Sequence, residues 1–262
     1  MITTIMRSFG AIGLGLLALL FAACGSRGTR NRTNEMNLPP VILWAWERPE
    51  DLRFLNSGRY GVAVLAQTLV LNGNDVIHKP RRQPLLVPPD AKVVAVTRIE
   101  SQRSKDQRPA FSVEQTTRVS EFIRKTLQLP NVSAIQVDFD ATSSERRFYR
   151  DLLTDLRSKL PDETPLSITA LASFCIGDRW IKDLPIDEAI PMAFRMGTDS
   201  VKIKAMLADG SDFRGELCQR SYGISLDEPL NLTFGTDRRV YVFNSRSWKE
   251  TDLKALEERL GQ

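Results

Sequence analysis

The sequence predicts an α/β fold, a (β/α)8 barrel of the TIM type, formed by residues 38–262 as a single domain. Short apolar, β-branched segments recur from Val41 onward, and many are followed by a helical pattern, which is typical of a parallel sheet. Eight such segments can be counted, the number that closes a barrel of this type. The length agrees, since single-domain barrels commonly run to about 200 to 250 residues.

The expected strands follow one another along the whole domain. In chain order they are 41–46, 60–65, 92–100, 134–140, 165–173, 189–195, 222–227 and 239–244. No helix is evident between the second and third, where Thr68 to Ile77 is typical of a β-hairpin with its turn at Asn72-Gly73. An open doubly wound sheet is the competing fold, although no glycine-rich phosphate loop follows an early strand.

Three helices are predicted most clearly, at 112–127, 143–160 and 248–260. In the second, Ser143 or Ser144 can serve as the N-cap, and apolar residues at four-residue spacing form a stripe for packing on the sheet. Pro161 then ends this helix.

The first 23 residues have the features of a secretory signal. A single charge, Arg7, precedes the apolar run from Phe9 to Ala22, which is too short to span a bilayer comfortably. Residues 24–37 are polar, small and basic, the composition of a flexible tether. We therefore expect residues 1–23 to be a signal peptide and folding to begin near Leu38.

The end of this segment, Leu20-Phe21-Ala22-Ala23-Cys24, resembles the lipobox of bacterial lipoproteins. The resemblance implies cleavage before Cys24 and attachment to a membrane through a lipid on Cys24. Gly25 and Ser26 follow without an acidic residue, which in similar lipoproteins implies the outer membrane, facing the periplasm. The alternative is an ordinary cleaved signal with a chance cysteine.

Charge and cysteine content argue against several other classes of function. The formal net charge of +4 includes Arg7, and basic and acidic residues are interspersed, so nucleic-acid binding is not expected. In an oxidising compartment Cys175 and Cys218 form either a disulfide or two separate buried thiols. No cysteine and histidine cluster has metal-ligand spacing and no Gly-x-Ser-x-Gly elbow is present, so neither a metal nor a cofactor is expected.

The fourth expected strand carries the strongest functional pattern. Gln136, Asp138 and Asp140 alternate in Ile-Gln-Val-Asp-Phe-Asp, which places them on one face of the strand and inside the barrel. Two inward carboxylates are costly, because burial and mutual repulsion raise a pKa. A structural network with Arg98 or Arg195 is the alternative to a functional site.

Other strand ends contribute polar and aromatic residues to the same mouth, because functional groups of parallel β/α folds collect at the carboxyl ends of strands. They are Trp44, Trp46, Glu47, Arg98, Glu100, Arg195, Asp227, Glu228 and Asn244. The two tryptophans either stack on a sugar face or belong to the core. Arg195 is positioned to hold Asp138 or Asp140 ionised, and Asp227-Glu228-Pro229 either serves the site or caps a turn.

Two families resemble this chain. The strings that begin Val41-Ile-Leu-Trp-Ala-Trp-Glu-Arg-Pro-Glu, Ile135-Gln-Val-Asp-Phe-Asp and Ala172-Ser-Phe-Cys-Ile-Gly-Asp-Arg-Trp resemble an uncharacterised family of bacterial lipoproteins predicted from sequence. A more distant similarity is to family 18 glycoside hydrolases, the chitinase-like barrels, whose fourth strand ends in Asp-x-Asp-x-Glu and whose sixth carries Met-x-Tyr-Asp. Here the matching positions are Gln136, Asp138 and Asp140 and the run Met192-Ala-Phe-Arg.

The second resemblance implies a role for each acid. Asp140 would be the general acid, and Asp138 would steady the N-acetyl group of the substrate. A different arrangement pairs Asp140 with Asp227 or Glu228 as nucleophile, with carboxyl groups about 5 to 5.5 Å apart in a retaining glycosidase and about 6.5 to 9.5 Å apart in an inverting one.

We therefore expect an envelope protein that hydrolyses or binds a polysaccharide, and the sequence leaves open whether it is an enzyme. One alternative is a non-catalytic protein that binds a glycan or a protein partner. The other is a structural tether whose acids are locked to arginines. An open cleft with an unpaired carboxylate favours hydrolysis, and a closed mouth with fully paired acids favours binding or structure.

Overall fold

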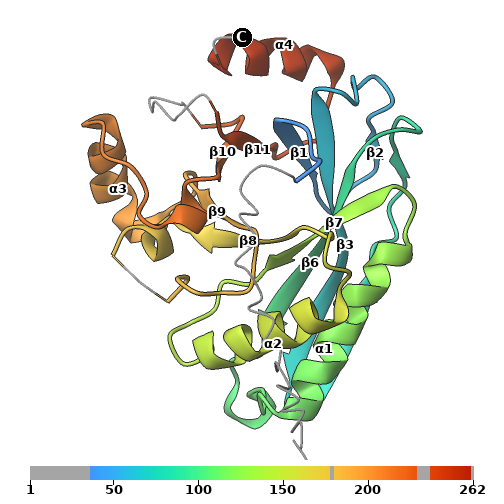
Figure 1. Ribbon diagram of the computed structural model, residues 1–262, viewed down its shortest axis with the longest axis vertical. Coiled ribbons are helices and arrows are strands. Elements are labelled where there is room, and N and C mark those ends of the chain that lie inside the picture. The colour runs from blue at the N-terminus through green and yellow to red at the C-terminus, as the bar shows by residue number, and fades with distance from the viewer. Residues whose placement is uncertain (1–35, 178–179, 229–236, 261–262) are drawn as a thin grey trace, which may run out of the picture. The chain divides into compact units, whose positions relative to one another are not determined.

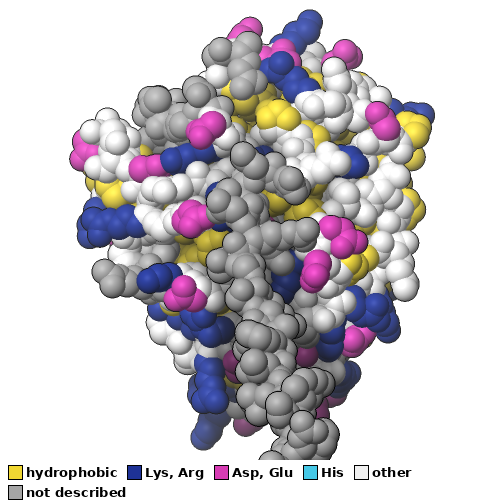
Figure 2. All heavy atoms as spheres, in the orientation of Figure 1, with side chains coloured by type: hydrophobic (Ala, Val, Ile, Leu, Met, Phe, Trp, Pro, Cys, Tyr) yellow, Lys and Arg dark blue, Asp and Glu magenta, His cyan; other side chains and the backbone are white. Residues whose placement is uncertain are grey.

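The computed structural model describes residues 36–177, 180–228 and 237–260. The expected signal peptide, Cys24 and all but the last two residues of the expected tether lie outside this range. Among the described residues, every helix is too short or too polar to span a lipid bilayer. Basic and acidic side chains are interspersed on the face drawn in Figure 2, as the sequence predicts.

The described residues include eight parallel strands that close into a barrel (Figure 1). Neighbouring strands are β1, β11, β10, β9, β8, β7, β6 and β3, and β1 pairs with β3 to complete the ring. This confirms the predicted fold class. The strands are β1 (Val41–Ala45), β3 (Tyr60–Asn72), β6 (Val93–Ser101), β7 (Val132–Asp138), β8 (Leu166–Leu171), β9 (Glu188–Met192), β10 (Ser221–Ser225) and β11 (Arg239–Phe243).

A β-hairpin replaces the helix after the second barrel strand, as expected. β3 extends beyond the barrel to Asn72, and β4 (Asp75–Pro80) returns antiparallel to it. Asn72 pairs with Asp75, so the two-residue turn is Gly73-Asn74 rather than the predicted Asn72-Gly73. Gly73 has a φ of 53°, a conformation that glycine adopts without the steric cost of a side chain. β2 (Glu50–Asp51) and β5 (Leu85–Leu86) form a separate two-stranded sheet.

The main helices lie close to the predicted positions, and a shorter one follows β9. They are α1 (Val113–Lys125), α2 (Arg146–Lys159), α3 (Ser200–Ala208) and α4 (Glu250–Leu260), with 3₁₀ turns η2 (Lys105–Gln107), η3 (Thr126–Gln128), η4 (Ala172–Cys175), η5 (Gly197–Asp199) and η6 (Glu216–Cys218). Ser112 caps α1 by accepting a hydrogen bond from the Gln115 backbone N–H at 3.2 Å.

The start of α2 differs from the prediction. Neither Ser143 nor Ser144 is its N-cap; Glu145 occupies that position, without a side-chain cap bond. The Glu145 carboxylate instead accepts hydrogen bonds from the backbone N–H of Thr142 at 2.7 Å and from its hydroxyl at 2.8 Å. The loop therefore folds back on Glu145, and the helix begins later than the serine pattern suggests.

Alternation along the strands separates the barrel interior from the layer under the helices. On β1, Ile42 and Trp44 belong to the interior cluster, whereas Val41, Leu43 and Ala45 pack outward. Burial of these side chains stabilises the fold by roughly 25 cal/mol for each Å² of apolar surface removed from water.

Cys175 at the end of η4 and Cys218 at the end of η6 form a disulfide, with their Cα atoms 5.9 Å apart. This resolves the two alternatives that the sequence left open. The bond ties the segment that follows β8 to the segment that precedes β10.

Candidate active site

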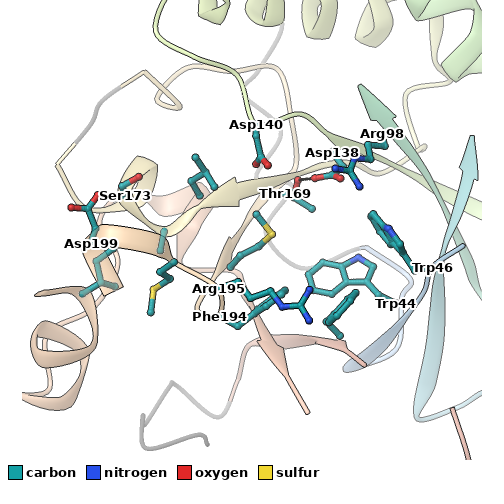
Figure 3. Close-up of a pocket in the computed structure, with 16 residues that line it drawn as sticks. Trp44, Trp46, Arg98, Asp138, Asp140, Thr169, Ser173, Phe194, Arg195 and Asp199 are labelled. Atoms are coloured by element: carbon teal, nitrogen blue, oxygen red, sulfur yellow. Dashed lines mark hydrogen bonds between the residues drawn. The ribbon is translucent and has the colours of Figure 1, made fainter. Parts of the chain in front are cut away.

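A pocket of about 460 Å³ lies at the carboxyl ends of the barrel strands (Figure 3). Six of the eight parallel strands or the residues just after them contribute to it, because the carboxyl ends of parallel strands converge on one end of a barrel. The lining residues are Trp44, Trp46, Arg98, Asp138, Asp140, Thr169, Leu171, Ala172, Ser173, Met192, Phe194, Arg195, Met196, Asp199, Ile203 and Phe243.

Asp138 is the last residue of β7, and its side chain faces the pocket as the alternation predicts. The Thr169 hydroxyl on β8 donates a hydrogen bond to Asp138 Oδ1 at 2.6 Å. Burial raises the pKa of Asp138 to about 6; the Thr169 bond opposes this rise, the Asp140 charge adds to it, and Arg98 opposes it. Asp138 therefore changes its charge in mildly acidic solution.

Asp140 comes two residues after the end of β7 and is exposed to solvent inside the pocket. Its chain position is fixed by Phe139, which is buried and packs at 5.2 Å, ring to ring, against Tyr149. The pocket walls nevertheless remove part of the water around its carboxyl group. This partial burial raises the pKa of Asp140, and the Arg98 charge opposes the rise. In the described part of the chain, neither Asp138 nor Asp140 forms an ion pair.

Aromatic rings form the opposite wall (Figure 3). Trp44 is 3% exposed and donates from its indole N–H to Gln136 Oε1 at 2.8 Å, so it is both a core residue and a pocket residue. Trp46 is partly exposed and packs edge-on against Phe243, with ring centroids 6.4 Å apart. Phe243 in turn stacks on Phe194 at 5.6 Å.

Gln136 is fully buried and lies outside the pocket lining, although its position in the strand predicted a ligand contact. It accepts from Trp44 and donates to the Ser167 hydroxyl at 3.3 Å. Alternation gives the direction of this side chain correctly, but the residue lies one layer deeper in the barrel. Its amide fixes the orientation of Trp44.

The two arginines at the mouth form no ion pair with Asp138 or Asp140, so the alternative of a structural network does not apply to the described residues. Arg98 lies beside Asp138 in the register of β6 and β7, yet its guanidinium Nε pairs with Glu100 Oε1 at 3.3 Å. Arg195 has a left-handed φ of 49°, and its guanidinium lies 4.9 Å from the centre of the Phe243 ring. The structural network that would neutralise Asp138 and Asp140 is therefore not formed among the described residues.

Four other expected site residues lie outside the pocket. The Asp227 carboxylate accepts from the Ser245 backbone N–H at 3.1 Å, and Glu228 accepts from the Arg195 N–H at 3.0 Å. Asn244 is buried and donates to Asp252 at 3.3 Å, whereas Glu47 borders a separate small pocket. Neither Asp227 nor Glu228 therefore lines the pocket together with Asp140.

Glu100 borders a second pocket of about 310 Å³ that also includes Arg98, Asp138 and Asp140. Sequence reasoning missed Thr169, Ser173, Asp199 and Phe243, which all line the first pocket. Thr169 was within reach of the same logic, because it lies in the middle of the fifth expected strand, where it alternates with the apolar residues Ile168 and Ala170. Asp199 could not be predicted as a pocket residue, since no sequence pattern in its loop indicates where its side chain lies.

No group of three or more histidine, cysteine, aspartate or glutamate side chains is arranged to hold a metal ion in 36–177, 180–228 and 237–260. The chemistry available to the pocket from the described residues is therefore that of two neighbouring carboxyl groups, a third carboxyl group on Asp199, two hydroxyls, two guanidiniums and an aromatic wall.

Comparison with known proteins gives two findings. Residues 90–181, which include Asp138, Asp140 and Thr169, match the model of a family described as "Domain of unknown function (DUF3142)". No curated protein matches the chain. A solved structure named "putative Chitinase A from Streptomyces coelicolor" is similar in fold, with a TM-score of 0.54 and 11% identity over 84% of this chain and 96% of that chain.

Proposed function

We propose that this chain hydrolyses a polysaccharide of the cell envelope in the pocket at the barrel mouth. The observation that carries the proposal is a pair of carboxyl groups without ion-pair partners in the described structure, Asp138 and Asp140, opposite an aromatic wall that includes Trp46. Aromatic rings stack on the apolar faces of sugars, and neighbouring carboxyl groups with different environments supply acid and base. The likeness in fold to the Streptomyces protein supports the same choice.

The two acids have different environments and so take different roles. Asp140 reaches solvent in the pocket, so we assign it the proton that is donated to the glycosidic oxygen as the bond to the anomeric carbon breaks. Asp138 is held by Thr169 and supplies negative charge beside the positive charge that develops on the sugar. Water then adds to the anomeric carbon, and its proton passes to the ionised Asp140.

The test is release of reducing ends from peptidoglycan, chitin oligomers and bacterial exopolysaccharides. We expect Asp140→Asn to lower the rate by at least about 100-fold, because general acid catalysis contributes roughly 10² to 10⁴. Asp151→Asn is the matched control, since Asp151 is an exposed carboxylate on α2. Equal rates for the native protein and Asp140→Asn would refute the assignment.

A glycan-binding protein without turnover is the second candidate. Asp140 forms no hydrogen bond among the described residues, and a catalytic acid is normally held by its surroundings. In that case no polysaccharide is cleaved, but one binds, and Trp46→Ala removes the binding. Absence of both cleavage and binding would overturn both candidates.

The cellular location is part of the proposal. We infer that the chain is exported and attached to the outer membrane through lipidated Cys24, facing the periplasm. The Cys175–Cys218 disulfide supports export, because disulfides persist mainly in oxidising compartments. Cys24→Ser should yield unprocessed or soluble protein; unchanged mass and membrane fractionation would contradict the inference.

A further inference from the structure

The two pockets at the barrel mouth share a wall. Arg98, Asp138 and Asp140 border both the pocket of about 460 Å³ and the second pocket of about 310 Å³. A ligand that extends across the two acids therefore contacts both pockets. This arrangement fits an oligomer with several units better than a single sugar.

The charge of the combined lining is opposite to that of the whole chain. The full sequence has a formal net charge of +4. The two pockets together have five carboxylates and three guanidiniums in their lining, those of Asp138, Asp140, Asp199, Glu100, Glu145, Arg98, Arg103 and Arg195. The mouth is thus an acidic site on a basic protein.

Two of the three arginines already contact other side chains of the protein. Arg98 pairs with Glu100, and Arg195 lies over the Phe243 ring. Arg103 is exposed in the second pocket only. The lining of the larger pocket thus has three carboxylates and two guanidiniums, and none of the three carboxylates forms an ion pair within the described ranges.

Asp199 adds an independent observation. It is the N-cap residue of α3, where an aspartate usually accepts a hydrogen bond from a backbone N–H of the first turn. Its side chain makes no such bond and lines the larger pocket instead, away from Asp138 and Asp140 in the close-up view (Figure 3). The acids are thus spread along the pocket, which suits positive charges that repeat along a ligand.

The aromatic wall already holds one cation of the protein beside the pocket. The ring of Phe243 already has the Arg195 guanidinium 4.9 Å from its centre, and Trp46 packs against the same ring. Tryptophan and phenylalanine faces attract cations, because the face of an aromatic ring carries partial negative charge. Aromatic faces next to carboxylates without partners form a suitable environment for an ammonium group.

We propose that the ligand is a cationic glycan, an oligosaccharide whose hexosamine units have free amino groups. One ammonium group meets the ionised Asp138, next to the proton donor Asp140, and another meets Asp199. A neutral or N-acetylated glycan would remove water from these carboxylates without offering an opposite charge in its place. An acidic glycan would be repelled by them. The inference rests on the proposed glycan site and specifies its substrate class.

The test is binding, followed by tryptophan fluorescence or calorimetry at low salt. The probes are glucosamine oligomers, N-acetylglucosamine oligomers of equal length, and galacturonate oligomers. We expect the glucosamine oligomers to bind at least about tenfold more tightly than the other two, which corresponds to about 1.4 kcal/mol. Asp199→Asn should weaken glucosamine binding about fivefold or more, a loss that falls within the range of a single charge contact. The loss for N-acetylglucosamine should be smaller than the loss for glucosamine, and Asp151→Asn should change neither.

The outcomes separate this inference from the proposed function. Equal or tighter binding of the N-acetylated or acidic oligomer would overturn the cationic specificity and leave a glycan site in place. Unchanged glucosamine binding in Asp199→Asn, with correct folding, would also overturn it. If none of the three probes and no envelope polysaccharide binds, both the inference and the proposed function fail.

Discussion

Two acidic side chains in the same barrel, Glu188 at the start of β9 and Asp138 at the end of β7, are held in opposite ways. Glu188 is completely buried, pairs with Arg239 Nη1 at 2.9 Å and accepts from the Tyr241 hydroxyl at 2.6 Å. Asp138 accepts one bond from a neutral hydroxyl and pairs with no cation in the described structure. The acid at the amino end of the barrel, Glu188, therefore has a paired cation, whereas the acid that faces the pocket, Asp138, has none.

The difference shows how structural and functional carboxylates can be distinguished in this molecule. Asp252 follows the first pattern, because it is buried and pairs with Arg246. Asp138 and Asp140 follow the second, and burial raises the pKa of both. An unpaired buried carboxylate costs stability, and this cost is expected to be retained only where a ligand uses the group.

The largest effect is expected at the paired acid. Glu188→Gln leaves the mostly buried Arg239 guanidinium without its counter-charge, so the free energy of unfolding should fall by about 3 to 5 kcal/mol. Urea denaturation followed by circular dichroism measures the change. A loss below about 1 kcal/mol would show that the buried pair does not stabilise the amino end of the barrel.

The disulfide near the open end gives the next effect. Replacing Cys175 and Cys218 together by alanine releases a loop with a sequence separation of 43, which should lower the free energy of unfolding by about 3 to 4 kcal/mol. Because η4 also contributes Ala172 and Ser173 to the pocket, glycan binding should weaken too. Stability equal to that of the native protein would mean that the covalent link is dispensable, and native affinity would mean that it does not support the pocket wall.

A smaller effect of opposite sign is expected at Asp138. Its folded pKa of about 6 lies above the unfolded value, so ionisation of Asp138 destabilises the folded state: the contribution of this group to stability is fully present below about pH 4 and is lost as the pH rises through 6. Asp138→Asn removes this cost and keeps an oxygen that accepts from Thr169. We expect the variant to be about 1 to 3 kcal/mol more stable than the native protein at pH 7 and about equal below pH 4.

Paired melting curves at pH 4 and pH 7 test this prediction. The same variant should lose polysaccharide cleavage. Reduced stability at pH 7 would place Asp138 with the structural acids instead.

Much of the fold was predictable from the sequence, because β-branched runs and helical stripes are local patterns. The hairpin after the second barrel strand was predictable for the same reason, whereas the N-cap of α2 was not, since Glu145 folds the preceding loop back onto itself. The direction of Asp138 followed from alternation along one strand.

The residues that surround Asp138 come from distant segments of the chain, and local sequence patterns do not specify such contacts. Thr169 reaches Asp138 from the neighbouring strand, and Asp199 comes from a loop before α3. Arg195 turns toward Phe243 through a left-handed backbone, so the expected pair with the acids does not form. The sequence also could not show that Gln136 lies below the pocket, because depth in the barrel is decided by packing against Trp44.

The most direct test of the account is the pKa of Asp138 in the ligand-free protein, measured by NMR titration of its side-chain carboxyl carbon and assigned with Asp138→Asn. We predict a midpoint of about 6, as expected for an acid that burial holds near neutrality without a paired cation. A midpoint at or below about 4, the ordinary range for aspartate, would show that the carboxylate is stabilised like a structural acid and would contradict the account.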